Sequence, residues 1–307
     1  IIKQKKKSQT SKMSLSVPHV RAQGDVLVRG HVVVDEDTED NTAVAGAIVV
    51  ENPVDTGLIL DLNAEQYNPG AQGWFNLVTT GPHLSFQVLD PSTLIQDSIK
   101  QRYHTRAGIV ESQHEPSYLR FSGAQKFGFR LPEDDENPGF SWELIIWPES
   151  HPPTTTQYLI WNNSIKLIFE GKNENEGLNE YLAILFREHN NEVVNIRSEV
   201  NLRDFAVQGC WNHVVLTYDG DNLIIYWNGI VKLNETRGPP HNYNTPQVLQ
   251  ISRAAVPGNQ FKGNFSRVRH YYHVLNADEV MQNYAYYNKY YLFGGDRNTN
   301  SPPTVNL

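Results

Sequence analysis

The sequence predicts an all-β protein built from antiparallel strands, and three observations carry this prediction. Segment 210–229 reads CWNHVVLTYDGDNLIIYWNG, in which two runs rich in β-branched and aromatic residues flank an Asp-Gly turn dipeptide. A second turn dipeptide, Asn228-Gly229, follows at once and leads into the apolar run 230–233. Similar short runs recur along the chain between turn residues, which is typical of a β-sandwich or jelly roll.

The strands and one helix follow in order along the chain. Each predicted strand is a run of β-branched, aromatic or alternating apolar residues that ends at Gly, Pro, Asn or Asp. The strands are expected at 25–30, 31–34, 47–50, 57–62, 118–121, 140–147, 158–162, 164–169, 180–187 and 193–198. One helix is expected at 276–284, because Asn276 is a suitable N-cap residue and Glu279 stands where a capping box needs it.

Composition fits a globular protein with one large domain or two modest ones. The 307 residues are 39% hydrophobic and 11% aromatic, which is ample for a packed core. Cys210 is the single cysteine, so an intrachain disulfide is excluded and assembly in a reducing compartment is favoured. The sequence shows no run of about 18 apolar residues, so no transmembrane segment is expected. The first residues do not show a signal-peptide pattern.

Charge is distributed unevenly along the chain. The net charge is −8, yet residues 1–21 contain only basic charged residues. The acidic remainder argues against nucleic-acid binding by the main domain. Lys5, Lys6 and Lys7 are candidate contacts for nucleic acid, anionic lipid or an acidic protein neighbour, and the alternative is a solvated terminus. We therefore divide the chain into a basic tail (1–19), a short β extension (20–56), a jelly-roll domain (57–293) and a C-terminal tail (294–307).

The proposed jelly-roll domain resembles a known superfamily. The sequences GLILDLNA at 57–64, YLRFSG at 118–123, CWNHVVLTYDG at 210–220 and FKGNFSRVR at 261–269 occur in the order found in laminin-G-like, concanavalin A-like jelly rolls. Tyr67 to Leu77 and the segment 275–280 add to the likeness. This resemblance implies a two-sheet antiparallel sandwich that ends in one short C-terminal helix, and we expect a short N-terminal β extension before it.

The N-terminal β extension has a resemblance of its own. Segments 24–34 and 45–50 are similar to repeat units of phage tail fibres and giant-virus structural proteins, which often stack in trimeric β-structures. Both resemblances together imply a minor capsid or surface component of a large DNA virus, with other capsid proteins or further copies of itself as partners. Its expected location is the virion, assembled in the host cytoplasm, and the alternative is extracellular or at the cell surface.

An enzymatic role is one alternative, because laminin-G-like domains share their scaffold with β-glucanases. A retaining glucanase needs two carboxyl groups about 5–5.5 Å apart. The glucanase pattern E-x-D-x-x-E is missing, and Glu143 has no carboxylate two or four residues away on its strand. Residues 134–136 are acidic but lie in a Pro- and Gly-flanked loop. We expect no enzyme, and a glycoside hydrolase remains the less favoured alternative.

Metal binding has one weak candidate. Asp219 and Asp221 provide oxygen ligands at a hairpin tip, and calcium prefers such ligands. The Asp-Gly turn already explains these residues sterically. The histidines show neither HExxH nor another zinc-ligand spacing, so no metal and no cofactor is expected, with calcium kept as the open possibility.

Glycan binding is the alternative to a purely structural role. Sugars stack on aromatic rings beside amide and carboxylate groups. Trp161, Asn162 and Asn163 form one candidate site, with Tyr243 and Asn244 in a second loop. The tyrosine-rich segment 284–293 either covers a sheet face or binds a partner, and its candidate contacts are Tyr286, Tyr287 and Tyr290. The sequence thus predicts a non-enzymatic virion structural protein, or alternatively a lectin module for host attachment.

Overall fold

The computed structural model describes most of the chain beyond residue 51 and two strands before it. The described residues are 14–21, 27–33, 52–68, 73–78, 87–88, 95–98, 102–105, 108–111, 116–122, 127–130, 139–148, 155–170, 181–202, 210–240, 248–252, 259–291 and 293. The chain divides into two compact units, with the boundary between residues 51 and 52.

The first unit contains a two-stranded antiparallel sheet. Strands β1 (Ser14–Arg21) and β2 (Leu27–Val33) pair so that Ser14 lies opposite Val33. The register shifts between Val17 and Val20, next to Pro18, because proline has no N–H to donate to the ladder. Strand β1 starts at Ser14, inside the segment 1–19 that we predicted to be a basic tail. The residues from Ser14 onward alternate between polar and apolar, which suits a strand.

The second unit is built around a nine-stranded antiparallel sheet. The strand order is β18-β17-β16-β11-β20-β3-β4, and β9 joins the edge of β20 with β6 beside it. The nine strands are β3 (Leu58–Asn68), β4 (Gly73–Asn76), β6 (Ile95–Ser98), β9 (Ser117–Ser122), β11 (Phe140–Pro148), β16 (Asn212–Tyr218), β17 (Asn222–Trp227), β18 (Ile230–Thr236) and β20 (Lys262–Tyr271).

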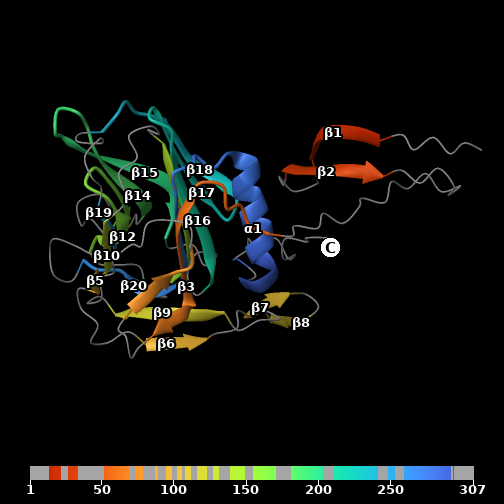
Figure 1. The fold of residues 1–307 in the computed structure, drawn as a ribbon, viewed down its shortest axis with the longest axis horizontal. Coiled ribbons are helices and arrows are strands. Elements are labelled where there is room, and N and C mark those ends of the chain that lie inside the picture. The colour runs from red at the N-terminus through yellow and green to blue at the C-terminus, as the bar shows by residue number, and fades with distance from the viewer. Residues whose placement is uncertain are drawn as a thin grey trace, which may run out of the picture. The chain divides into compact units, whose positions relative to one another are not determined.

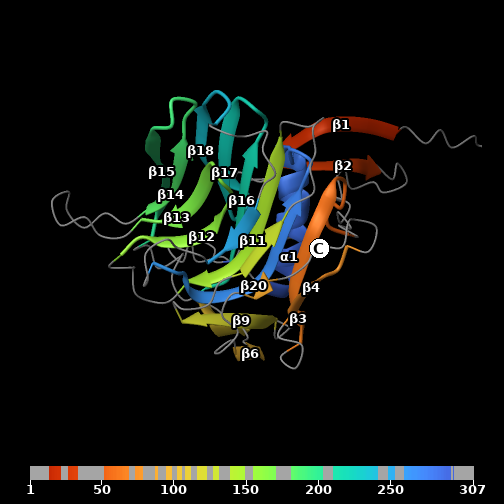
Figure 2. The ribbon, with the colours of Figure 1, turned by 60° about the vertical axis from the view of Figure 1, so that its left-hand side comes forward.

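A seven-stranded antiparallel sheet packs against it. Its order is β15-β14-β13-β12-β19-β10-β5. The seven strands are β5 (Gln87–Val88), β10 (Phe127–Arg130), β12 (Gln157–Trp161), β13 (Ile165–Phe169), β14 (Tyr181–Arg187), β15 (Val193–Asn201) and β19 (Val248–Ile251). A separate hairpin pairs β7 (Arg102–Thr105) with β8 (Gly108–Glu111). Figures 1 and 2 show the two large sheets facing each other, which confirms the predicted β-sandwich.

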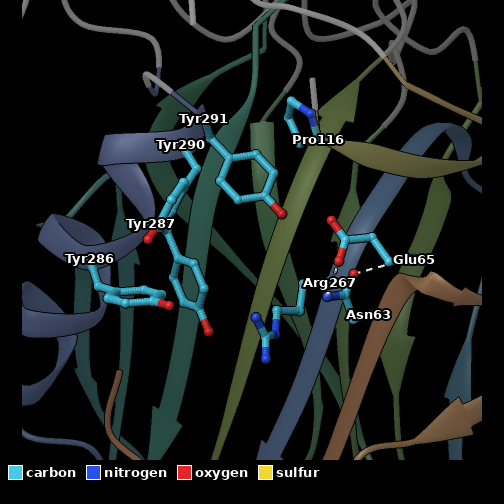
Figure 3. Close-up of a pocket in the computed structure, with 8 residues that line it drawn as sticks. All are labelled: Asn63, Glu65, Pro116, Arg267, Tyr286, Tyr287, Tyr290 and Tyr291. Carbon is cyan, nitrogen blue, oxygen red and sulfur yellow. Dashed lines mark hydrogen bonds between the residues drawn. The ribbon is translucent and has the colours of Figure 1, made fainter. Parts of the chain in front are cut away.

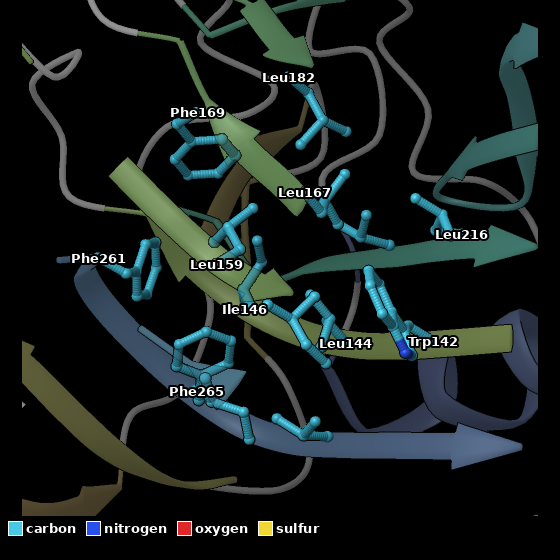
Figure 4. Close-up of a cluster of buried hydrophobic side chains, with 14 of the residues drawn as sticks. Trp142, Leu144, Ile146, Leu159, Leu167, Phe169, Leu182, Leu216, Phe261 and Phe265 are labelled. Carbon is cyan, nitrogen blue, oxygen red and sulfur yellow. The ribbon is translucent and has the colours of Figure 1, made fainter. Parts of the chain in front are cut away.

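The main core lies between the two sheets. Trp142, Leu144 and Ile146 alternate along β11 and point inward, where they meet Leu159 and Leu167 of the opposite sheet (Figure 4). All five side chains have no measurable exposure. Burying a large apolar side chain stabilises the fold by about 1.5–3 kcal/mol, so this layer supplies most of the driving force.

The hairpin from β16 to β18 has the turns that the sequence predicts. Gly220 takes a φ of 103°, and Asn228 and Gly229 take φ values of 51° and 78°. These left-handed conformations suit glycine and asparagine and match the twist of the two strands they join. At Gly229 an added Cβ would lie 3.1 Å from the Cε atom of Met281, so helix packing also disfavours a side chain there.

The single helix in the described part of the chain, α1 (Ala277–Tyr291), starts as predicted and ends later. Asn276 Oδ1 accepts hydrogen bonds from the N–H groups of Asp278 and Glu279 at 2.9 and 3.2 Å, and Glu279 accepts one from Asn276 N–H at 2.8 Å. This capping box confirms the start. The helix extends seven residues past the predicted end at 284, because its tyrosines pack on the sheet and outweigh their moderate helix propensity. Within the described residues, no helix has the length and apolar character to cross a membrane.

Helix α1 covers the outer face of the nine-stranded sheet. Its residues Tyr284, Tyr287 and Tyr291 pack on Ile145 and Trp211 of that sheet. This third layer explains why β11 is buried on both of its faces. The outer face under the helix therefore holds polar and charged side chains that water does not reach, and these build the candidate site.

Candidate functional site

An open pocket lies where α1 meets strands β3 and β20. Its volume is about 320 Å³. Figure 3 shows tyrosine side chains extending from the helix toward polar side chains of the strands. The lining residues are Asn63, Glu65, Pro116, Arg267, Tyr286, Tyr287, Tyr290 and Tyr291.

Helical periodicity arranges the four tyrosines in two pairs. Tyr287 and Tyr291, four residues apart, face the sheet and are buried. Tyr286 and Tyr290 lie one position earlier around the helix, are partly exposed, and pack edge to face with ring centroids 5.5 Å apart. The exposed pair therefore forms an aromatic wall, and the buried pair forms the floor next to it.

Arg267 brings the positive charge of the pocket. Its Nε and Nη2 atoms donate to the two oxygens of Asp61 at 2.7 and 2.5 Å. The guanidinium carbon lies 5.3 Å from the ring centroid of Tyr287, within the range of a cation–π contact. Burial alone would lower the pKa of Arg267, but the hydrogen bond to Asp61 and the nearby tyrosines raise it above its ordinary value. This side chain is therefore a permanent hydrogen-bond donor.

The tyrosine hydroxyls also keep their protons. Burial raises the pKa of Tyr287 far above its ordinary value and that of Tyr291 to about 12. The Tyr291 hydroxyl lies 2.9 Å from Ser266 Oγ, which gives it a partner. The Tyr287 hydroxyl is buried, and among the described residues it has no hydrogen-bond partner.

Asn63 and Glu65 form the polar rim on β3. Glu65 N–H donates to Asn63 Oδ1 at 3.0 Å, and Asn63 Nδ2 donates to Glu65 Oε2 at 3.3 Å (Figure 3). The indole N–H of the buried Trp74 donates to the carbonyl of Asn63 at 2.8 Å and fixes this part of the strand. This rim therefore places the Glu65 carboxylate and the Asn63 amide at the pocket, on a strand whose backbone Trp74 fixes in position.

A buried charge network lies under the helix beside the pocket. Glu143 accepts hydrogen bonds from Tyr271 Oη at 2.6 Å and Arg269 Nη1 at 3.0 Å, and its other oxygen lies 2.7 Å from His213 Nε2. Burial would raise the pKa of Glu143, but His213 and Arg269 lower it to about 2. The Glu143 side chain is 1% exposed. It therefore serves as an internal counter-ion and is out of reach of a substrate.

The predicted glycan residues on β12 lie elsewhere, on the seven-stranded sheet. Asn162 is buried, and its Oδ1 accepts from the N–H groups of Ser164 and Ile165 at 3.0 and 2.8 Å. Trp161 is partly exposed, and Lys166 Nζ lies 5.0 Å from its ring centroid. Asn163 is in the same turn and is partly exposed. Asn162 thus holds the turn, while sugar contacts by this group remain a prediction.

Several other predicted residues lie outside the described residues. These are Tyr243 and Asn244 of the second glycan loop and the three tail lysines Lys5, Lys6 and Lys7. The tyrosines predicted as partner contacts, Tyr286, Tyr287 and Tyr290, all line the pocket.

The two aspartates proposed for calcium form a turn at the tip of the β16–β17 hairpin. Asp219 Oδ1 accepts from the N–H groups of Asp221 and Asn222 at 2.9 and 2.6 Å, and Oδ2 accepts from Asn222 Nδ2 at 2.9 Å. Throughout the described ranges, no three His, Cys, Asp or Glu residues gather as a metal site would need.

Sequence reasoning missed Arg267, Asn63 and Glu65 as parts of one site. Arg267 and its partner Asp61 are 206 positions apart, so no local pattern joins them. The detectable signal was the spacing of the tyrosines, since residues four apart share one face of a helix.

Comparison with protein families settles the superfamily. Residues 123–281, more than half of the chain, match the family model described as the concanavalin A-like lectin/glucanases superfamily. The chain belongs to this superfamily. A search of curated proteins finds no significant match. The concanavalin A-like resemblance seen in the sequence is thereby confirmed.

Solved structures share the concanavalin A-like fold at low sequence identity. The binding domain of botulinum neurotoxin DC in complex with rat synaptotagmin II is 13% identical, with a TM-score of 0.51, covering 79% of this chain and 56% of that one. The same binding domain in complex with SialylT is 13% identical, with a TM-score of 0.51, covering 79% and 55%. The binding domain of Paraclostridial Mosquitocidal Protein 1 is 12% identical, with a TM-score of 0.49, covering 76% and 53%. The chain thus spans about half the length of these binding domains.

Proposed function

We propose that this protein is a non-enzymatic, lectin-like module that binds carbohydrate. The observation that carries the proposal is the pocket that four tyrosines of α1 line together with Arg267, Asn63 and Glu65. Concave sites that combine aromatic surface with a few polar groups are typical of small-molecule recognition. The membership in a superfamily of lectins and glucanases supports a sugar as the ligand.

The burial of Glu143 supports a non-enzymatic role. A glycosidase must bring two carboxyl groups to the scissile bond, at about 5–5.5 Å from each other or about 6.5–9.5 Å. Glu143 is sealed beneath α1 and held by Arg269. Among the described residues that line the pocket, Glu65 is the one carboxylate. Binding without hydrolysis is therefore the expected activity.

A glycan panel tests the proposal. The full chain is expected to bind at least one glycan. The double variant Tyr286→Ala, Tyr290→Ala is expected to lose at least about tenfold in affinity, because a ring stacked on an aromatic side chain contributes on the order of 1–3 kcal/mol. Tyr158→Ala, which removes a partly exposed tyrosine from the other sheet, is the matched control. Circular dichroism checks that each variant folds. A chain that binds no glycan on the panel contradicts the proposal.

We further propose that the module is carried on a virion, as the sequence resemblance implies. The support is the first unit, whose strands β1 and β2 pair with each other in a two-stranded sheet of their own. Unpaired strand edges of a two-stranded sheet are suited to pairing with further copies or with other capsid proteins.

Light scattering after size exclusion tests the assembly role of the first unit. The full chain is expected to elute as a defined oligomer, because an isolated two-stranded hairpin is at best marginally stable without partners. A monomer over the whole concentration range would argue against self-assembly through this unit.

A further inference from the structure

We infer that the pocket between α1, β3 and β20 takes a neutral, hydroxyl-rich sugar ring and discriminates against acidic sugars. This inference rests on the proposed carbohydrate-binding function and names the ligand class and the site. Three properties of the pocket carry it: its charge, its hydrogen-bonding groups and one buried hydroxyl.

The charges of the pocket do not favour a carboxylate. Among the described residues that line the pocket, Arg267 is the one cation. Its charge is already matched by the two-point contact with Asp61. Glu65 adds a further negative charge, and within the described residues its side chain contacts the Asn63 amide but no cation. A sugar acid would therefore meet an unpaired carboxylate at the rim, and like charges at close range disfavour binding.

The polar groups of the pocket suit sugar hydroxyls. Nη1 of Arg267 makes no hydrogen bond to the described residues and is available as a donor. The Glu65 carboxylate offers acceptors on the opposite side. A sugar hydroxyl both donates and accepts, so neighbouring hydroxyls on one ring can satisfy both groups. The partly exposed rings of Tyr286 and Tyr290 offer apolar surface for the C–H face of the same sugar.

The Tyr287 hydroxyl points to a ligand independently. This residue is 1% exposed, lines the pocket, and its hydroxyl has no hydrogen-bond partner among the described residues. Figure 3 shows the Tyr287 side chain extending from α1 beside Arg267. Leaving a buried hydroxyl unpaired is unfavourable, and nearly all such groups in folded proteins have a partner. A ligand hydroxyl that reaches the pocket floor would supply the missing partner.

The variant Tyr287→Phe gives the sharpest test, because it removes only this hydroxyl. Affinity for a neutral glycan is expected to fall about 3- to 10-fold, as for the loss of one hydrogen bond. The melting temperature is expected to stay the same or rise, since no hydrogen bond within the described protein is lost. A purely structural hydroxyl would show the opposite: a lower melting temperature with unchanged affinity.

Titrations of the full chain use neutral oligosaccharides and, for each, its counterpart capped by a carboxylate-bearing sugar. The neutral member is expected to bind more tightly, and Glu65→Gln is expected to narrow the difference by removing the negative rim charge. Tighter binding of the acidic members would overturn the neutral class but leave carbohydrate binding intact. Glycan binding that Trp161→Ala abolishes and Tyr287→Phe leaves unchanged would place the site on the other sheet. Binding of neither member of any pair would overturn the proposed function itself.

Discussion

Replacing Glu143 by alanine is expected to lower the free energy of unfolding by about 3–5 kcal/mol, the range measured when one partner of a buried ion pair is removed. The carboxylate is 1% exposed and is held by Arg269, Tyr271 and His213. Without it, the guanidinium of Arg269, which is 2% exposed, stays buried near the more distant Asp61, 3.6 Å from its Nε. Urea unfolding followed by tryptophan fluorescence measures the effect.

The matched control for Glu143 is Glu188, which belongs to a partly exposed ion pair. Glu188 Oε1 accepts a hydrogen bond from Arg237 Nη1 at 3.2 Å, and the side chains of Glu188 and Arg237 are 34% and 29% exposed. Exposed ion pairs contribute about 0–1 kcal/mol, so Glu188→Ala is expected to have a small effect. Equal losses in both variants would show that the buried network does not stabilise the fold beyond an ordinary surface pair. A measurable glycan turnover that Glu143→Gln abolished would contradict the proposed non-enzymatic role.

The free energy of unfolding is expected to decrease as the pH falls below about 6.5, and His270 is the expected cause. This imidazole is buried against Phe140 and Tyr272, at ring-centroid distances of 5.8 and 5.4 Å. Neither ring nitrogen has a hydrogen-bond partner among the described residues. Burial lowers the pKa of His270 to about 3. The nearby backbone of Ser141 acts in the opposite direction and offsets part of this lowering.

The sign follows from proton binding in the two states. Between pH 6.5 and 3 the unfolded chain protonates this histidine and the folded chain does not, so acid favours unfolding by up to about 1.4 kcal/mol per pH unit. The stability is fully present above the ordinary pKa of histidine. Glu143, whose pKa is lowered to about 2, adds its own loss only in the lower window between about 4.5 and 2.

Urea denaturation at a series of pH values between 7 and 4.5 checks the role of His270. The variant His270→Phe, which keeps an aromatic ring in the apolar site, is expected to flatten the pH dependence in this window. His189→Gln, at an exposed position, is the control that leaves the buried imidazole in place. An unchanged slope in His270→Phe would assign the acid sensitivity to other groups.

Much of the sandwich was predictable because its signals are local. The turn at Asn228-Gly229 needs left-handed backbone angles that these residues adopt readily, and Asn276 with Glu279 caps a helix through contacts three residues apart. The β-rich run at 140–147 likewise identified a strand, and the structure turns its residues Trp142, Leu144 and Ile146 inward. Each of these features depends on neighbours in the chain, so a single sequence contains the information.

The candidate site was only partly predictable because its contacts are long-range. The density of aromatic residues in 284–293 indicated either a covered sheet face or a partner-binding surface. The capping residues located the start of the helix but no residue pattern located its end, so its last seven residues were missed. Asp61 meets Arg267 and Glu143 meets Arg269 only because β3 and β11 pair on the two sides of β20. Nothing local in either strand selects these partners.

The sequence by itself determined the all-β class, the positions of most strands along the chain, the hairpin turns and the start of α1. Propensity, alternation and capping act over a few residues, so these features can be predicted locally. The tertiary structure alone decided that α1 covers the outer sheet face, which seals Glu143 away from solvent and turns the tyrosines toward Arg267. The physical reason is that burial and charge pairing depend on which distant segments pack together. Only the packed fold therefore distinguishes an internal counter-ion from a reactive carboxylate, and a surface tyrosine from the floor of a pocket.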